Sequence, residues 1–314
     1  MSSMKPDASK VTIGNNKARI KEFLSDVILA PRARIMAWSR ITNQTPNLKI
    51  GYPGQHLASL ITGIPGTGTG ARGDDIADGT EVKSCSRVDQ VDTCLDCASN
   101  VFRVQTSCPK CGSSNIRRNN DSKWLITIHN RDELNLYLNE IPRTLFLISD
   151  YPNFDEGDYD TLRFTSFEIW NQSERAAAFR QILKDYLEKI YSKHTARDRD
   201  KTPAPKNFWP YSYQFYMCNP IKTFECIIRN AGTEPEIEIT HYVDPRADRK
   251  DMPSENLPAK LLKDPEFAAL RSHGIEIDEN GSVDEEVKRF LCLRDTSRAM
   301  PHKTAYRRRK PASE

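Results

Sequence analysis

The sequence predicts an α/β fold, and its length, its composition and the order of its periodic segments lead to that class. The chain has 314 residues, which suits about two domains at roughly 150 residues each. Hydrophobic residues make up 38% and charged residues 28%, a balance that excludes disordered and collagen-like chains. Between residues 124 and 191, strand-like runs alternate with helical runs, as they do in α/β domains.

The composition also excludes membrane-spanning and exported proteins. Uninterrupted apolar runs are only a few residues long, which is too short for a helix that crosses a bilayer. The first ten residues, MSSMKPDASK, lack the apolar stretch of a secretory signal. We therefore expect a cytoplasmic protein without membrane association, whose eight cysteines are reduced rather than paired in disulfides.

Both ends of the chain are basic. Residues 1–49 contain nine Lys or Arg residues against three acids, and a basic cluster lies at Arg307–Lys310. Basic ends of this kind can bind the phosphate backbone of a nucleic acid. The alternative is that the last residues are a solvated tail that binds nothing. Apolar residues within Ile20–Ile28 mark one face of an amphipathic helix that Pro31 is expected to end, and a second helix is expected over 32–41.

A short helix over Gln55–Thr62, capped by Gly63, is expected before a glycine-rich loop at 63–73. The loop contains GTGTGARG, a glycine pattern similar to a dinucleotide-binding fingerprint. Such a fingerprint follows a strand and opens a helix. Here a helix precedes the glycines and a strand follows them, so the pattern disfavours a nucleotide site.

Residues beyond 120 alternate between strands and helices until a polar, proline-bearing stretch at 193–210, which we expect to be a linker. Aromatic residues at every second position from Trp209 to Phe215 fit a half-buried strand better than a base-stacking surface. The expected strands are 124–128, 145–149, 162–170, 212–217, 224–229 and 236–242, and the expected helices are 131–138, 173–191, 264–273 and 285–293.

Four of the cysteines have the spacing of a metal site. Cys94 and Cys97 form one CxxC motif, Cys108 and Cys111 form another, and ten residues separate the two. Each motif is a turn that points two thiolates at one centre, so the pair completes a tetrahedral four-cysteine site for Zn²⁺. Four thiolates leave no open position, which predicts a structural rather than a catalytic metal.

A candidate hairpin, with strands at 74–77 and 80–85, lies between the glycine-rich loop and the cysteines. Asp78-Gly79 is the sequence signal of a two-residue type I′ turn. With that turn, Asp74 lies opposite Lys83 on the neighbouring strand.

The same register gathers charged side chains on one face of the hairpin. Asp74, Glu81 and Lys83 fall on that face, whereas Asp75 and Val82 fall on the other. Two carboxylates suit Mg²⁺, and an ammonium group beside them can orient water or stabilise charge on a phosphate. The face therefore predicts phosphodiester hydrolysis, and the alternative is a solvated surface with a cross-strand ion pair.

Asp74 followed by Glu81-Val82-Lys83 resembles the PD-(D/E)XK nuclease signature, in which an aspartate precedes a Glu-x-Lys triplet on the next strand. The stretch GYPGQHL at 51–57, together with GARGDDIADGTEVKSC, is similar to type II restriction endonucleases and above all to the MamI-type family. That family also carries a cysteine insert after the catalytic strand. The seven-residue step from aspartate to glutamate is similar to mismatch-repair nicking endonucleases as well.

The sequence departs from these patterns at two positions. Gly73 stands where the signature has proline, and Ala58 stands at the position where the nicking enzymes carry a glutamate on the preceding helix. Gln55 or His56 is the alternative source of a further ligand.

The resemblance implies a PD-(D/E)XK nuclease core with a mixed sheet, an inserted four-cysteine zinc ribbon and a C-terminal α+β DNA-recognition region. It implies a restriction endonuclease that cleaves double-stranded DNA at a palindromic or interrupted-palindromic site and acts as a homodimer. Asp74 and Glu81 would hold Mg²⁺, Lys83 would assist the attacking water, and Cys94, Cys97, Cys108 and Cys111 would hold Zn²⁺. The expected regions are 1–50 (basic and helical), 51–192 (nuclease core, with the ribbon at 94–111), 193–210 (linker) and 211–314 (DNA recognition and basic tail).

Two other functions fit part of the pattern. A structure-specific repair nickase or junction resolvase would use the same catalytic face. A non-catalytic zinc-ribbon DNA-binding protein would make the hairpin carboxylates incidental.

Overall fold

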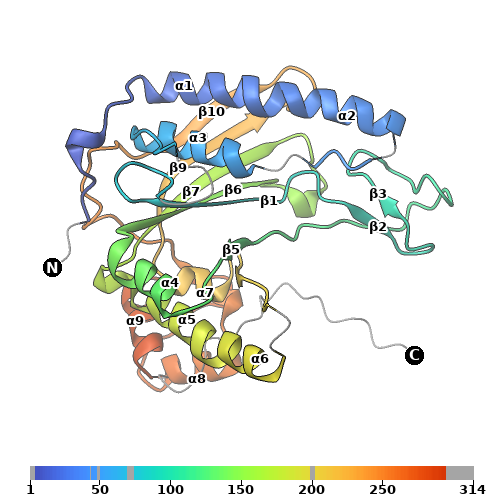
Figure 1. The fold of residues 1–314 in the computed structure, drawn as a ribbon. Helices are drawn as coiled ribbons and strands as arrows, with labels where there is room; N and C mark the ends of the chain where they lie inside the picture. Colours follow the sequence, from blue (N-terminus) through green and yellow to red (C-terminus); the bar gives the residue numbers. More distant parts are fainter. Residues whose placement is uncertain (1–3, 43, 48–49, 69–73, 199–201, 295–314) are drawn as a thin grey trace.

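A five-stranded mixed sheet forms the centre of the protein (Figure 1). The computed structural model describes residues 4–42, 44–47, 50–68, 74–198 and 202–294. The strands lie in the order β1 (Glu81–Ser86), β6 (Arg143–Asp150), β7 (Leu162–Trp170), β9 (Ile221–Arg229) and β10 (Glu236–Tyr242). β1 runs parallel to β6, and every other neighbouring pair is antiparallel. The predicted α/β class with a mixed sheet is confirmed.

The N-terminal helices cover one face of this sheet, as Figure 1 shows above the strands. α1 (Asn16–Phe23), the π-helical segment η2 (Leu24–Leu29) and α2 (Ala30–Thr42) follow one another without a break. α3 (Gly51–Thr62) contacts both α1 and β1, and it ends at Gly63, whose φ of 69° is left-handed as expected of a glycine cap.

The expectation that Pro31 ends the first helix is wrong. A proline inside an α-helix removes one hydrogen bond, and its ring collides with the carbonyl group four residues earlier. Here the wider π-helical turn comes directly before the proline, and Ala30 N donates to the carbonyl oxygen of Ser25, five residues back. The widened turn accommodates Pro31, so the chain continues as a helix.

The remaining helices cover the opposite face of the sheet (Figure 1). They are α4 (Arg131–Asn135), η3 (Leu136–Glu140), α5 (Ala177–Asp185), η6 (Tyr186–Tyr191), α6 (Ser192–Arg197), α7 (Tyr213–Met217), α8 (Asp264–Arg271) and α9 (Glu285–Arg294). Short 3-10 turns lie at η1 (Ala8–Lys10), η4 (Phe154–Glu156), η5 (Glu174–Ala176) and η7 (Ala259–Leu261). β5 (Trp124–Ile126) pairs with β8 (Lys206–Phe208), and β11 (Leu257–Pro258) pairs with β12 (Ser282–Val283). Among the residues placed by the structure, we find no helix with the length and apolarity needed to cross a bilayer.

Strand β6 shows why the sheet needs both helical layers. All eight of its residues are buried. Leu145 and Leu147 pack with the N-terminal helices, whereas Phe146 and Ile148 pack with the helices on the other face. Because side chains alternate along a strand, a continuous apolar run is stable only with cover on both sides.

The expected strand at 212–217 is a helix instead. Ser212 caps α7, since its side chain accepts a hydrogen bond from Phe215 N at 3.2 Å. Tyr211, just before the cap, has a left-handed φ of 56° that turns the chain away from an extended path. The alternation of aromatic residues therefore does not reflect a strand, because a run this short has no period that distinguishes the two structures.

The expected division into a nuclease core and a separate C-terminal region does not match the packing. Residues 193–210, expected as a linker, contain most of α6 and all of β8. β9 and β10 extend the same sheet as β1, and Phe208 and Phe215 pack against the Trp124 ring. Chain segments on both sides of the expected linker thus share one core. The basic cluster at 307–310 lies outside the described residues.

Candidate catalytic hairpin and four-cysteine site

The turn before β1 has three residues rather than two. Ile76 N donates to the carbonyl oxygen of Thr80 at 3.2 Å, and Gly79 N donates to that of Ile76 at 2.9 Å. A type I′ turn needs a positive φ at both central residues. Gly79 has a φ of 85°, but Asp78 is not among the residues with positive φ.

The expected strand at 74–77 is not formed. Ile76 forms an isolated bridge with Gly66 of the glycine-rich loop, and among the described residues β1 pairs with β6 and not with 74–77. The predicted pairing of Asp74 opposite Lys83 is therefore wrong. Asp75 is the aspartate that reaches β1, because its carboxylate accepts from Val82 N at 2.8 Å, close enough to Glu81 and Lys83 for their charges to act on it. Asp74 itself is exposed, and its backbone carbonyl accepts a hydrogen bond from the Thr67 hydroxyl.

Both carboxylate oxygens of Asp75 are held by the protein. Gln55 Nε2 on α3 donates to Oδ1 at 2.5 Å, and the backbone N of Val82 donates to Oδ2 at 2.8 Å. Of the two alternative side chains on α3, Gln55 thus points at the site, whereas His56 is exposed with its ring 6.1 Å from that of Phe23. The Asp75 side chain is thus held by α3 and by β1, and the sequence did not predict that these two elements meet at this residue.

The surroundings of Asp75 make its charged form unfavourable. Burial raises the pKa of Asp75 to about 6, and the hydrogen bond from Val82 N opposes that shift. The neighbouring negative charge of Glu81 raises the pKa further, while Lys83 lowers it. A carboxyl with a raised pKa in a cluster of charges is typical of functional sites.

Lys83 is the cation of the same face. Its Nζ lies 2.5 Å from Glu81 Oε1, and only about a fifth of each side chain is exposed. Burial acts to lower the pKa of Lys83, but Tyr137 and Glu81 outweigh it, so the pKa lies above its usual value. Lys83 therefore stays an ammonium group at neutral pH.

Arg143 holds the turn in place with buried hydrogen bonds. Its guanidinium group, 1% exposed, donates from Nε to Thr80 Oγ1 at 2.9 Å and from Nη2 to Asp78 Oδ2 at 2.7 Å. Nη1 donates to Glu168 Oε1 at 2.8 Å, and Glu168 Oε2 accepts from Arg249 Nε at 3.3 Å. Burial acts to raise the pKa of Glu168, but the two guanidinium groups outweigh it and hold that pKa below its usual value. The turn is thus tied to strands β6 and β7.

Replacing Arg143 with alanine should destabilise the protein strongly. The substitution leaves the Asp78 and Glu168 carboxylates buried with fewer partners, which costs about 3–5 kcal/mol. Arg229→Ala is the matched control, because its pair with Glu238 is more than half exposed and contributes about 0–1 kcal/mol. Urea unfolding measures both values. Equal losses in the two variants would contradict the anchoring role of Arg143.

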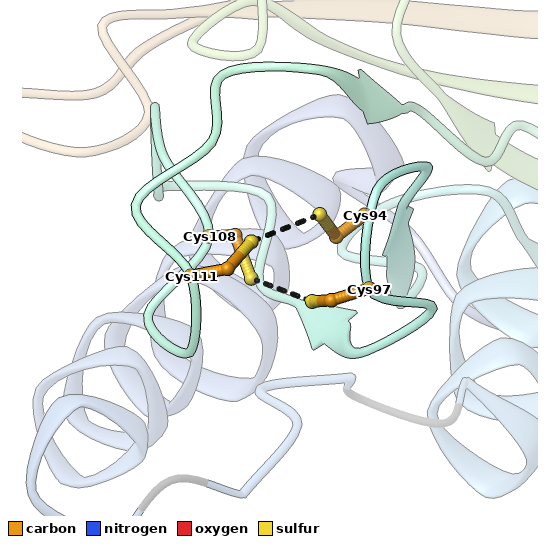
Figure 2. Close-up of side chains that lie close together, drawn as sticks. All are labelled: Cys94, Cys97, Cys108 and Cys111. Carbon is orange, nitrogen blue, oxygen red and sulfur yellow. Dashed lines mark hydrogen bonds between the residues drawn. The ribbon is translucent and has the colours of Figure 1, made fainter.

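The four cysteines converge in a small subdomain of three short strands (Figure 2). Its strands are β2 (Asp92–Cys94), β3 (Asn100–Val101) and β4 (Ile116–Arg117). The four sulfur atoms, on Cys94, Cys97, Cys108 and Cys111, lie within 4.8 Å of one another. Two Sγ pairs are 3.6 and 3.5 Å apart, and none of the four residues forms a disulfide. A tetrahedral zinc site with Zn–S bonds of about 2.3 Å separates its sulfur atoms by about 3.8 Å, so the cluster has the required size.

The two CxxC motifs fold into the same turn. Ala98 N donates to the carbonyl oxygen of Cys94 at 3.0 Å, and Gly112 N donates to that of Cys108 at 2.9 Å. The residue after each motif is left-handed, with a φ of 57° at Ala98 and 72° at Gly112. Ala98 keeps this conformation without the freedom of a glycine. The repeated geometry points each pair of sulfur atoms toward the other pair.

Asp92 ties the segments of this subdomain together, and Arg103 joins it to the core. Its two carboxylate oxygens accept from Arg118 Nη1 at 2.8 Å, from Asn119 N at 2.7 Å and from Arg103 Nη2 at 2.9 Å. The Arg103 guanidinium also lies 4.7 Å from the centre of the Tyr159 ring. Because Asp92 and Arg103 are almost fully buried, their ion pair is part of the packed base of the subdomain.

Comparisons with known proteins give one family. The model of the family described as MamI restriction endonuclease matches residues 37–260. The type II restriction enzyme MamI of Microbacterium ammoniaphilum is 34% identical over 73 residues, which is 23% of this chain and 24% of that enzyme. The matched stretch thus spans about a quarter of the length of that curated relative. No solved structure matches the chain.

Proposed function

Since the chain belongs to the MamI restriction endonuclease family, we propose that it is a Mg²⁺-dependent type II endonuclease that cleaves double-stranded DNA at a specific site. The observation that carries this proposal is the gathering of Asp75, Glu81 and Lys83 at the start of β1, beside a helix that holds Asp75 in place. Glu81 and Lys83 lie on β1 at the edge of the mixed sheet, and Asp75 lies just before the turn that leads into it, which supports the order of the PD-(D/E)XK signature.

The donor set of the hairpin fits a hard divalent cation. Asp75, before the turn, and Glu81, the first residue of β1, both offer carboxylate oxygens, and Mg²⁺ is bound through one or two carboxylates with water in its other positions. The relevant first aspartate is thus Asp75 rather than Asp74. When bound, Mg²⁺ would act as a Lewis acid on the phosphodiester and lower the pKa of a bound water.

Side chains and backbone groups of the protein have the other roles in the proposed reaction. Lys83 is held as an ammonium group, so it acts as a hydrogen-bond donor and a positive charge rather than as a base. It can orient the attacking water or stabilise the charge that builds on the phosphate. Gln55 and Val82 N keep the Asp75 carboxylate in one orientation, which fixes the metal-binding oxygens before substrate arrives.

For the four-cysteine site we propose a structural Zn²⁺. All four ligands are thiolates, and a closed set of four cysteines leaves no position for water or substrate. The three strands around the site have two or three residues each, too few to bury a core of their own. Metal binding would therefore supply much of the folding free energy of this subdomain.

A homodimer and a palindromic or interrupted-palindromic site complete the proposal. Two-fold symmetry in the protein would match two-fold symmetry in the DNA, so each protomer would cut one strand. A nickase or resolvase and a non-catalytic DNA-binding protein are the alternatives. Plasmid DNA incubated with the protein and Mg²⁺ distinguishes them: discrete fragments support the proposal, whereas open circles, branch-specific cutting or uncut, shifted DNA would contradict it.

Two neighbouring substitutions test which aspartate belongs to the site. Asp75→Asn should lower the cleavage rate by about 100-fold or more, because it removes a metal-binding carboxylate. Asp74→Asn, the matched control, should have a much smaller effect. Single-turnover cleavage with equal amounts of folded protein gives both rates. The reverse order would favour the two-residue turn and return Asp74 to the catalytic face.

The raised pKa of Asp75 predicts a pH dependence of metal binding. Below about pH 6 the carboxyl is protonated, so a proton and Mg²⁺ compete for it. The affinity for Mg²⁺ should fall by about tenfold per pH unit below 6 and level off above 7. Calorimetric titration at pH 5.0, 6.0 and 7.5 measures this change. A constant affinity across the range would rule out a shared proton and metal site at Asp75.

Loss of one thiolate should release the proposed zinc. Elemental analysis should find about one zinc per chain in the wild-type protein and much less in Cys94→Ser, which should also be more sensitive to protease. Cys218→Ser is the matched control, since Cys218 is fully buried but lies outside the cluster. If metal-free wild-type protein melts at the same temperature as the native form, the site has no structural metal.

A further inference from the structure

Helix α2 carries its apolar side chains on the outside. Its buried residues are Arg32 and Ser39, and both are polar. By contrast, Trp38 is 64% exposed, Ile41 is 75% exposed and Ile35 is 36% exposed. In a helix that only covers its own sheet, the apolar residues face the core and the polar residues face solvent. Because the pattern is reversed here, the apolar face of α2 suits a partner outside this chain.

The inner side of α2 is held by an ion pair rather than by apolar packing. Figure 1 shows α2 extending past the strands, at the end of the molecule where the cysteine subdomain lies. Arg32 Nε lies 2.7 Å from Asp89 Oδ2, and Arg32 Nη2 lies 2.9 Å from Oδ1 of the same carboxylate. A helix of 13 residues depends on the packing of an apolar face for most of its stability. Cover over the outer face would supply that packing.

The exposed apolar side chains form one narrow strip along α2. At about 100° per residue, Ile35 and Ile41 lie about 60° to either side of Trp38. Arg34, which is also exposed, lies between Trp38 and Ile41 around the helix. Arg32 lies about 120° from Trp38, on the inner side. We call Arg34, Ile35, Trp38 and Ile41 the α2 strip.

We propose that the α2 strip binds the α2 strip of a second copy of this chain, with the two helices antiparallel. This inference rests on the homodimer of the proposed function. A two-fold interface uses the same surface on both copies, so the strip must be complementary to itself. If the helices cross at the level of Met36, Arg34 lies beside the partner's Trp38, where its guanidinium group can stack on the indole ring. Ile41 then lies beside the partner's Pro31.

The antiparallel arrangement also keeps like charges apart. The two Arg34 side chains begin about 6 Å apart along the helix axis, and the two axes are separated by about 8–10 Å. Arg40 lies about 160° from Trp38 around the helix, so it stays outside the contact. Each Arg34 thus meets an aromatic ring rather than the other Arg34.

The composition of the strip favours a protein surface over DNA. Trp38 and Ile41 gain free energy when their apolar surface leaves water, and a phosphate backbone offers them no apolar surface in return. Arg34 is the one cation in the strip, whereas phosphate binding relies on several. A second copy supplies both the apolar cover and an aromatic partner for Arg34.

A contact between two single helices is a small interface. A stable complex buries about 800 Å² on each partner, and a helix face about 20 Å long and about 10 Å wide provides less than that. We therefore expect a dissociation constant in the micromolar range. A DNA site with two-fold symmetry would bring two copies together and strengthen the contact.

Ile41→Lys tests the proposal, because it adds a second positive charge to the strip without removing a core side chain. Sedimentation velocity of the full chain from about 1 to about 200 µM, without DNA or Mg²⁺, measures the dissociation constant. We expect the wild-type protein to dimerise and the constant of Ile41→Lys to be higher by about 50-fold or more, since each dimer loses two apolar contacts. Leu125→Lys is the matched control, because Leu125 is 47% exposed but lies on β5.

The fluorescence of Trp38 gives a second measurement that needs no added charge. Its indole ring is exposed in one copy and would be covered in the dimer, whereas Trp124 and Trp170 are buried in both states. Acrylamide should therefore quench the wild-type protein less as its concentration rises through the dissociation constant. Trp38→Phe should lose this change. Quenching that stays constant while the protein dimerises would place the interface on another surface.

The outcomes separate this interface from the proposed nuclease activity. A wild-type protein that stays monomeric at about 200 µM, or an Ile41→Lys variant that dimerises as tightly as the wild type, would overturn the interface. A monomeric protein whose affinity for DNA falls in Trp38→Ala would overturn it too and assign the strip to DNA. If the wild-type protein dimerises through α2 but does not cut DNA, the interface is supported and the nuclease proposal is wrong.

Discussion

The buried guanidinium group of Arg143 is the constraint on which the candidate site depends. A cation that is 1% exposed must be paired, and here it is paired with Asp78, with Glu168 and with the Thr80 hydroxyl. Asp78 can reach it only when its side chain turns inward, where Oδ1 also accepts from the Thr80 hydroxyl at 2.6 Å and from Thr80 N at 3.2 Å. These bonds favour the three-residue turn over the type I′ turn, and the turn sets which aspartate meets Glu81.

The sequence predicts the five strands of the central sheet from their apolar or alternating patterns. The expected strands at 162–170 and 236–242 match β7, which is buried on both faces, and β10, an edge strand whose residues alternate in exposure, residue for residue. Register is different, because it depends on the number of residues in a turn. The dipeptide Asp78-Gly79 fits both a two-residue turn and the end of a three-residue turn. The sequence alone contains no sign of Arg143 beneath it, so the pattern led to Asp74 and the structure to Asp75.

The sequence named one side chain of the site but not what it does there. Gln55, expected as a source of a further ligand, lies 20 residues before Asp75 and donates to the Asp75 carboxylate. This contact depends on tertiary packing, which a spacing motif does not reveal. The same limit explains the expected linker at 193–210. Its polar and proline-bearing composition suggested a boundary, but Phe208 inside it is fully buried against Trp124 and Phe146.

The two candidate metal sites lie at opposite ends of one strand, and this separation decides what each can do. Glu81 begins β1 and Ser86 ends it, a distance of about 17 Å at roughly 3.3 Å per residue. The chain leaving β1 is fixed at Asp89, which accepts from Arg32 Nε at 2.7 Å and from the Tyr151 hydroxyl at 2.9 Å, before it enters the cysteine subdomain. A zinc ion held there would lie too far away to touch a phosphate held beside Asp75 and Glu81. In the proposed reaction the cysteine subdomain would therefore act through DNA binding or the stability of the sheet and not in the chemical step.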